Sequence, residues 1–144
     1  MEYQVGDKIV HPAYGPGEIK GITEKRLGGH VNQYYVIDVA VRRLEVMVPC
    51  SRTKEVGIRP VSPPQLFSQM WETFSEEPTL LPRDHKQRTA IIQEEITSGD
   101  LLRVAAAARD LAALRLTRRL SYTDRGHLEE AETQIASELA LAED

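Results

Sequence analysis

The sequence predicts an α+β protein, with a small antiparallel β-barrel first and a compact all-α domain after it. Two observations lead to this prediction. Up to about residue 60, short runs rich in β-branched and aromatic residues are separated by glycine and proline, which is typical of strands and turns. From Ser62 onward, apolar residues recur with the helical period instead. We therefore divide the chain into residues 1–61 and residues 62–144.

Five short strands account for the first part, and five strands in about sixty residues predict a strongly bent barrel. Two of them flank the proline- and glycine-rich corner within residues 5–22, where glycine supplies backbone angles that other residues resist. Gly28-Gly29 marks the next turn, and residues 41–43 carry the turn after it. The remaining strands are expected at residues 33–39, 44–49 and 58–61.

The first helix of the second part is expected to begin at Ser62. This serine is placed to cap the helix, with a proline in the first helical position and Gln65 three residues further on. Along the helix, one face carries the apolar residues Leu66, Met70, Trp71 and Phe74. We therefore expect Trp71 to pack in the core.

Three more helices follow in the second part. One is expected at residues 84–96, and the break at residues 97–100 ends it. Asp100 is placed to cap the next helix, and Ser121 is placed to cap the last one together with Asp124. Both helices carry an apolar stripe at the helical period, so the second part is expected to be a compact helical bundle.

The chain of 144 residues has a net charge of −4, which argues against a protein that coats DNA nonspecifically. The charge is uneven, because residues 1–61 carry +2 and residues 62–144 carry −6. All nine basic residues of the second part lie between Arg83 and Arg125, and only acidic charges follow. Such a basic zone can meet a phosphate backbone, although solvated helix faces would give the same pattern.

No feature of the sequence indicates catalysis or a membrane. The four histidines are scattered, no phosphate loop is present, and Cys50 has no sequence partner for metal binding or nucleophilic chemistry. We expect Cys50 to be a small buried residue, and a single cysteine fits a reducing cytoplasm. No apolar run approaches the roughly 20 residues that span a bilayer, and no signal peptide is visible. We therefore expect no enzyme, no cofactor, no metal and no membrane association.

Several motifs occur together in register. The first part contains Val5-Gly-Asp7, Pro12, Tyr14-Gly15, Tyr34, Val48-Pro49 and Val56-Gly57 with Arg59. The second contains Ser98-Gly-Asp100, Val104-Ala105, Arg109-Asp-Leu111, Leu120-Ser121 and the closing run at residues 135–142. On these motifs the chain resembles, over nearly its whole length, the CarD/CdnL family of bacterial transcription regulators. The resemblance implies that the barrel is Tudor-like (SH3-like).

The resemblance also implies partners. In this family the barrel docks on the β subunit of RNA polymerase, near its protrusion and lobe. The helical domain reaches promoter DNA at the upstream edge of the melted bubble and stabilises the open complex. The polymerase-facing residues implied here are Lys25, Arg26, Arg43 and Met47, with core packing as the alternative for Met47. A monomer in the cytoplasm, on the nucleoid through RNA polymerase, is expected by the same resemblance.

The chain departs from the family at the residue that enters the DNA. Members commonly carry a tryptophan at the start of the second helix, followed by two arginines, and this tryptophan wedges into the minor groove. His85 stands at the tryptophan position here, Gln87 and Arg88 stand at the arginine positions, and Lys86 restores some charge. Imidazole has a smaller face than indole, so we expect weaker stabilisation of the opened base step.

The residues expected to contact DNA are therefore His85 and the cations Arg83, Lys86, Arg88, Arg115, Arg118 and Arg119. For Arg118 and Arg119 the alternative is that they cap a helix carboxyl end. Two functions stay open. The chain either stabilises the bubble, or it occupies the polymerase site without a wedge and acts as a competitor or repressor.

Overall fold

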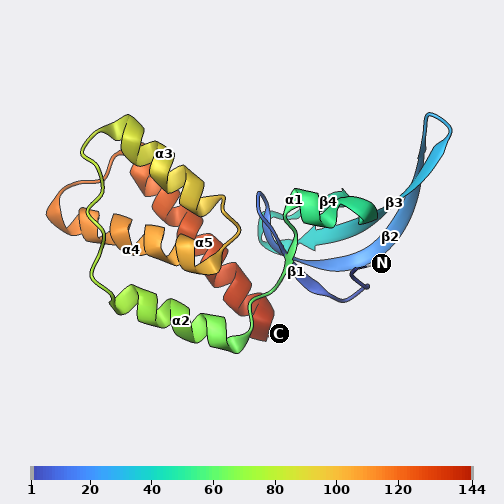
Figure 1. Cartoon of the computed structure of the whole chain (residues 1–144), viewed down its shortest axis with the longest axis horizontal. Helices are drawn as coiled ribbons and strands as arrows, with labels where there is room; N and C mark the ends of the chain where they lie inside the picture. Colours follow the sequence, from blue (N-terminus) through green and yellow to red (C-terminus); the bar gives the residue numbers. More distant parts are fainter. Residues whose placement is uncertain (1, 144) are drawn as a thin grey trace. The chain divides into compact units, whose positions relative to one another are not determined.

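The structure is a computed structural model that describes residues 2–143 (Figure 1). The chain divides into two compact units. The first, which we call the strand unit, comprises residues 1–61 together with residues 140–144. The second, which we call the helical unit, comprises residues 62–139.

Within the described residues, the strand unit contains one antiparallel sheet of five strands, as predicted. They are β1 (Lys8–His11), β2 (Gly15–Leu27), β3 (His30–Val39), β4 (Leu44–Pro49) and β5 (Arg59–Pro60). The predicted turns are confirmed as well. Gly28 and Gly29 have φ angles of 56° and 82°, and a 3₁₀ turn after β3 ends at Arg43 with a φ of 54°. The short helix α1 (Thr53–Val56) was not expected.

The sheet does not close into the predicted barrel. Its spatial order is β4-β3-β2-β1-β5, and in the described part of the chain the outer strands β4 and β5 do not pair with each other. A β-bulge between Ile19 and Gly21 bends β2, yet β5 has only two residues in the ladder. The result is a bent, open sheet in which β4 forms one edge.

Apolar side chains that alternate along the strands form the core of this unit. Ile9, Ile19 and Ile37 are almost completely buried, and Tyr35 lies among them. The Tyr35 hydroxyl accepts a hydrogen bond from the Tyr3 N–H at 2.9 Å and donates one to the Tyr3 carbonyl at 3.1 Å. The start of the chain is thereby fastened to the core of the sheet.

From residue 62 to residue 143 the chain forms four α-helices, the last of which extends into residues 140–143. They are α2 (Pro64–Ser75), α3 (His85–Ile96), α4 (Leu101–Thr117) and α5 (Tyr122–Glu143). The predicted caps of the later helices are confirmed, because the Asp100 carboxylate and the Ser121 hydroxyl accept hydrogen bonds from backbone N–H groups of the turn that follows. Asp84 caps α3 in the same way. These caps fix where each helix begins.

Two predictions about α2 are wrong. The helix begins at Pro64, and Ser62 does not cap it; the Ser62 N–H instead donates to the Glu138 carboxylate at 2.8 Å. Trp71 is 55% exposed rather than buried. At 100° per residue it lies more than a quarter turn around the helix from Met70, which is fully buried. Trp71 therefore falls outside the face that packs on the core.

The core of the helical unit is built around α4. Its buried residues include Leu101, Val104, Ala105, Ala108 and Leu111. The small alanine side chains allow neighbouring helices to approach closely, and Met70, Ile92 and Leu128 pack there from α2, α3 and α5. Side chains from α2, α3, α4 and α5 thus form one core cluster.

The close packing of Gly17 gives a first prediction. A Cβ at this position in β2 would lie 2.8 Å from both the Asp38 carbonyl oxygen and the Ile37 Cγ2, which is closer than van der Waals contact permits. We expect Gly17→Ala to lower the free energy of unfolding by about 1–3 kcal/mol, the usual cost of overpacking. Urea denaturation of the full chain measures this change.

Gly21→Ala is the matched control, because a Cβ at Gly21 would meet nothing within 4 Å. Its free energy of unfolding should stay within about 0.5 kcal/mol of the wild-type value. Equal stability of the two variants would contradict the close packing at Gly17.

Candidate nucleic-acid and protein interfaces

The amino ends of α3 and α5 lie close together at one end of the helical unit, and the carboxyl end of α4 lies on the same side, joined to α5 by the loop of residues 118–121 (Figure 1). One ion pair fixes this arrangement. The Nε of Arg88, in the first turn of α3, lies 3.0 Å from Oδ1 and 3.2 Å from Oδ2 of Asp124, in the first turn of α5. We call the surface around this pair, formed by residues 82–88, 115–119 and 121–125, the basic end.

The Arg88–Asp124 pair is buried, with side-chain exposures of 3% and 1%. Burial by itself raises the pKa of the Asp124 carboxyl. Hydrogen bonds from Arg88 and Ser121, together with the charge of Arg88, outweigh burial and hold this pKa below its usual value. Asp124 is therefore ionised at neutral pH, and its charge is neutralised inside the protein.

Arg88 has a different role from the predicted phosphate contact. Its Nη1 donates to the backbone carbonyls of Pro82 and Arg83, at 3.2 and 3.1 Å. Because the side chain is 3% exposed and bonded on several sides, a DNA phosphate cannot reach it. Arg88 holds the segment before α3 against the start of α5. It is buried below the surface of the basic end and positions the residues there.

His85, the residue at the family's tryptophan position, is exposed at the first position of α3. Its Nδ1 lies 3.2 Å from Nη2 of Arg88. A guanidinium group can only donate, so Nδ1 accepts and the neutral ring carries its proton on Nε2. His85 therefore offers a hydrogen-bond donor at the surface but only a small apolar face.

The other five cations predicted to contact DNA are all exposed: Arg83, Lys86, Arg115, Arg118 and Arg119. None of them forms an ion pair with another described residue. The backbone N–H of Arg118 donates to the Leu114 carbonyl at the end of α4. Within residues 2–143, the Arg118 side chain makes no capping hydrogen bond. These side chains are thus positioned to meet an anionic partner.

Arg125 is a further exposed cation, which the sequence motifs did not indicate as a DNA contact. It lies in the first turns of α5, and it too forms no ion pair with any described residue. The signal that could have identified it is its place as the last cation of the basic zone. With Arg125 included, the described part of the chain places six unpaired cations at the basic end.

The Arg109-Asp-Leu111 motif has a structural role that the sequence did not reveal. The Arg109 Nη1 donates to the Thr73 carbonyl at 3.1 Å, and the Asp110 carboxylate accepts from the Thr79 N–H at 2.9 Å. Thr73 lies in the last turn of α2, and Thr79 lies on the connection that leads from α2 to α3. The motif thus fastens this connection to α4.

On the strand unit, the four residues expected to face a polymerase are all exposed. Lys25 and Arg26 lie on β2 near its turn into β3, and Arg43 follows β3 at the other end of that strand. Met47 lies on β4 and is 37% exposed, so the core alternative for it is wrong. Its neighbours on either side, Val46 and Val48, pack against the core instead.

These four residues do not form one compact patch. Arg26 pairs with Val31 near the start of β3, whereas Arg43 comes after Val39 at its end. Eight residues of extended strand span about 25 Å. A partner that contacts all four residues must therefore extend along most of β3.

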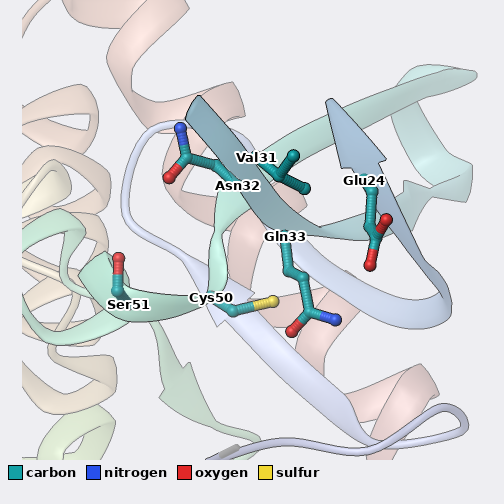
Figure 2. A pocket seen from close by; sticks show the side chains of 6 residues that line it. All are labelled: Glu24, Val31, Asn32, Gln33, Cys50 and Ser51. Atoms are coloured by element: carbon teal, nitrogen blue, oxygen red, sulfur yellow. The ribbon is translucent and has the colours of Figure 1, made fainter. Parts of the chain in front are cut away.

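A groove on the strand unit is lined by Glu24, Val31, Asn32, Gln33, Cys50 and Ser51 (Figure 2). The Gln33 amide and the Cys50 sulfur point toward the same space. Cys50 is half-buried rather than buried as expected, and burial raises the pKa of its thiol. A thiol with a raised pKa is a poor nucleophile at neutral pH, so the groove offers polar binding groups and no activated sulfur.

Within residues 2–143, no group of three or more His, Cys, Asp and Glu side chains is arranged to hold a metal ion. The same residues include no helix with both the length and the apolar character that crossing a membrane requires.

Family models match both halves of the chain. Residues 3–62 match the CarD-like/TRCF RID domain, and residues 69–144 match the CarD C-terminal domain. The chain belongs to the CarD-like family of transcription factors. The resemblance indicated by the sequence motifs is thereby confirmed.

A curated relative agrees with this assignment. "Putative transcription factor YdeB" of Bacillus subtilis (strain 168) is 33% identical over 141 residues, which cover 96% of this chain and 91% of the relative. Among solved structures, a similar chain is the 72-residue N-terminal domain of Myxococcus xanthus CarD, solved by solution NMR. It is 26% identical, has a TM-score of 0.34, and the match covers 40% of this chain and 76% of that domain.

The buried ion pair gives a second prediction. Asp124→Ala leaves the Arg88 charge buried without a partner, and we expect the free energy of unfolding to fall by about 3–5 kcal/mol. Because the folded-state pKa of Asp124 is lowered, this stabilisation is present above about pH 4 and is lost as the pH falls through the folded-state value. Urea denaturation at pH 7 and at lower pH measures both effects.

Two comparisons make this test specific. Glu95→Gln removes an exposed ion pair with Arg103 and should cost at most about 1 kcal/mol. The double variant Arg88→Met/Asp124→Leu replaces the pair by apolar side chains and should recover most of the lost stability. An Asp124→Ala protein no less stable than Glu95→Gln would show that the pair does not hold the two helices together.

Proposed function

We propose that residues 1–61 bind the β subunit of RNA polymerase, as a Tudor-like domain near the protrusion and lobe. Residues 62–144 contact promoter DNA at the upstream edge of the bubble, so that the chain stabilises the promoter open complex. On this proposal the protein works as a monomer in the cytoplasm, on the nucleoid through RNA polymerase. It acts by binding and not by catalysis.

The observation that carries the proposal is the succession of two family matches along one chain, residues 3–62 and then residues 69–144. A protein built of both domains can hold one partner with each. The first domain then positions the second, because tethering raises the effective concentration of a second binding event. Weak DNA binding by the helical unit is sufficient in such an arrangement.

The geometry of the basic end supports a DNA contact. The described residues place six exposed cations there, and none is neutralised by an ion pair within the described chain. The net charge of the whole chain is nevertheless −4, so binding to phosphate must be local and oriented. This arrangement favours stabilisation of the open complex over the competitor alternative, because a competitor that does not contact DNA needs no basic surface.

The open edge of the sheet supports a protein contact on the strand unit. In the described chain, β4 pairs on one side only, with β3. An edge strand can accept a strand of a partner through its backbone groups. Met47 lies exposed on this strand and offers an adaptable apolar contact, while Lys25 and Arg26 supply charge nearer the hairpin turn.

The proposal is tested by the lifetime of open complexes on a housekeeping promoter, formed by purified bacterial RNA polymerase holoenzyme and challenged with a competitor. Added protein should lengthen the lifetime by about 10-fold, which corresponds to about 1.4 kcal/mol. An unchanged or shortened lifetime, with binding to the polymerase verified in the same sample, would support the competitor instead.

The contribution of the strand unit gives a separate prediction. Lys25→Glu/Arg26→Glu should weaken binding to the polymerase by about 10-fold or more, because like charges are brought against an acidic partner surface. The full chain titrated against immobilised holoenzyme measures the Kd.

The matched control is Arg52→Glu/Lys54→Glu, which changes the net charge equally elsewhere on the same unit, at exposed positions. It should bind like the wild type. If the two double variants bind equally, Lys25 and Arg26 do not face the polymerase. Circular dichroism establishes that both variants keep the fold.

A further inference from the structure

The basic end carries two large apolar side chains in water. Tyr122, the first residue of α5, is 85% exposed, and Leu116, in the last turn of α4, is 87% exposed. Neither side chain contributes to the core of the helical unit. Both side chains are therefore available for contact with a partner at this surface.

Tyr122 is held on a rigid support. Ser121, directly before it, caps α5, and Asp124, two residues after it, is fixed by the buried bond to Arg88. The same Arg88 bonds to His85 on α3. Tyr122 therefore lies on the same anchored pair of helix ends as His85, and its ring is larger.

The charges around Tyr122 indicate a polyanion as the partner. The basic end contains the six unpaired cations Arg83, Lys86, Arg115, Arg118, Arg119 and Arg125. Its only exposed carboxylate within the described chain belongs to Asp84, which is engaged in capping α3. Cations that hold a phosphate backbone, with an aromatic ring among them, form the usual platform on which a nucleic-acid base stacks.

Gly126 adds an independent observation. It lies inside α5, four residues after Tyr122 and hence on the same face. A Cβ there would meet nothing within 4 Å, so no packing within the protein requires glycine. Glycine weakens a helix interior relative to alanine, and a common reason to keep it is the close approach of another molecule's backbone. The space beside Tyr122 is thus left open.

Trp71 is the other exposed aromatic residue of the helical unit that could stack on a base, and it lacks this setting. The helix that carries it, α2, contains no basic residue and has Glu72 beside Trp71. The Trp71 ring also lies against Phe74, with ring centroids 5.8 Å apart. Its surroundings therefore do not favour a phosphate backbone.

We propose that Tyr122 is the side chain that stacks on a base at the junction between duplex and melted DNA, with Gly126 leaving room for the DNA backbone. This inference rests on the proposed DNA contact and deepens it. His85 then supplies a hydrogen-bond donor beside the ring, and the cations hold the phosphates on either side.

The test compares binding of the full chain to two DNA probes at low salt, by fluorescence anisotropy. One is a fork-junction DNA, in which a duplex opens into single strands, and the other is a blunt duplex of the same sequence. Tyr122→Ala should bind the fork about 10-fold more weakly, the effect of losing one stacked base, and should bind the duplex within about twofold of the wild type. Tyr122→Phe should retain fork binding.

Three further variants separate stacking from other effects. Arg118→Ala should weaken binding to both probes alike and reduce the salt slope by about one. Gly126→Ala should raise the melting temperature while weakening fork binding by several-fold, a combination that a purely structural role would not produce. Trp71→Ala should bind both probes like the wild type.

The outcomes distinguish this inference from the proposed function. A lengthened open-complex lifetime that Tyr122→Ala leaves unchanged would overturn the inference alone. A Tyr122-dependent preference for the fork without any effect on lifetime would overturn open-complex stabilisation and support the inference. Wild-type protein without a fork preference, or a Tyr122→Ala protein that loses only polymerase binding, would overturn the stacking assignment.

Discussion

The helical unit depends on the buried bond between Arg88 and Asp124. It joins residues 36 positions apart in the chain and brings the amino ends of two helices to one surface. Each of these helix ends carries a partial positive charge from its backbone, which adds to the exposed cations around it. The pair itself contributes no net charge to that surface, because the two buried groups neutralise each other. The electrostatics of the basic end thus come from exposed side chains and helix ends, while its shape comes from the pair.

The two units offer different kinds of surface. On the helical unit, three helix ends converge, and the cations belong to short segments that are fixed by caps and by the ion pair. On the strand unit, the residues expected to face a protein are spread along β3 and β4 over about 25 Å. A convergent charged surface suits the closely spaced phosphates of a nucleic acid. An elongated edge with free backbone groups suits an extended protein segment.

Much of the fold follows from local sequence patterns. The strands, the Gly28-Gly29 turn and the caps at Asp100 and Ser121 each depend on a few neighbouring residues, so the sequence predicts them. The errors concern long-range packing. The residues next to Arg88 in the sequence do not show that it will form a buried ion pair with an aspartate on another helix. Likewise, the residues next to Trp71 do not show how much of the surface of α2 is buried. The prediction of a closed barrel was wrong for the same reason, because closure depends on whether two edge strands that are far apart in the sequence pair with each other.

The distribution of charge along α5 has a consequence for how partners find the protein. This helix of 22 residues is about 33 Å long, with Arg125 near its start and the exposed glutamates Glu129, Glu132 and Glu143 further along. A polyanion is attracted to one end and repelled from the other, so the protein experiences a torque before contact. The Debye length is about 8 Å at physiological salt, so this alignment acts only in the final approach. Rising salt should therefore slow productive encounters as well as weaken the bound state.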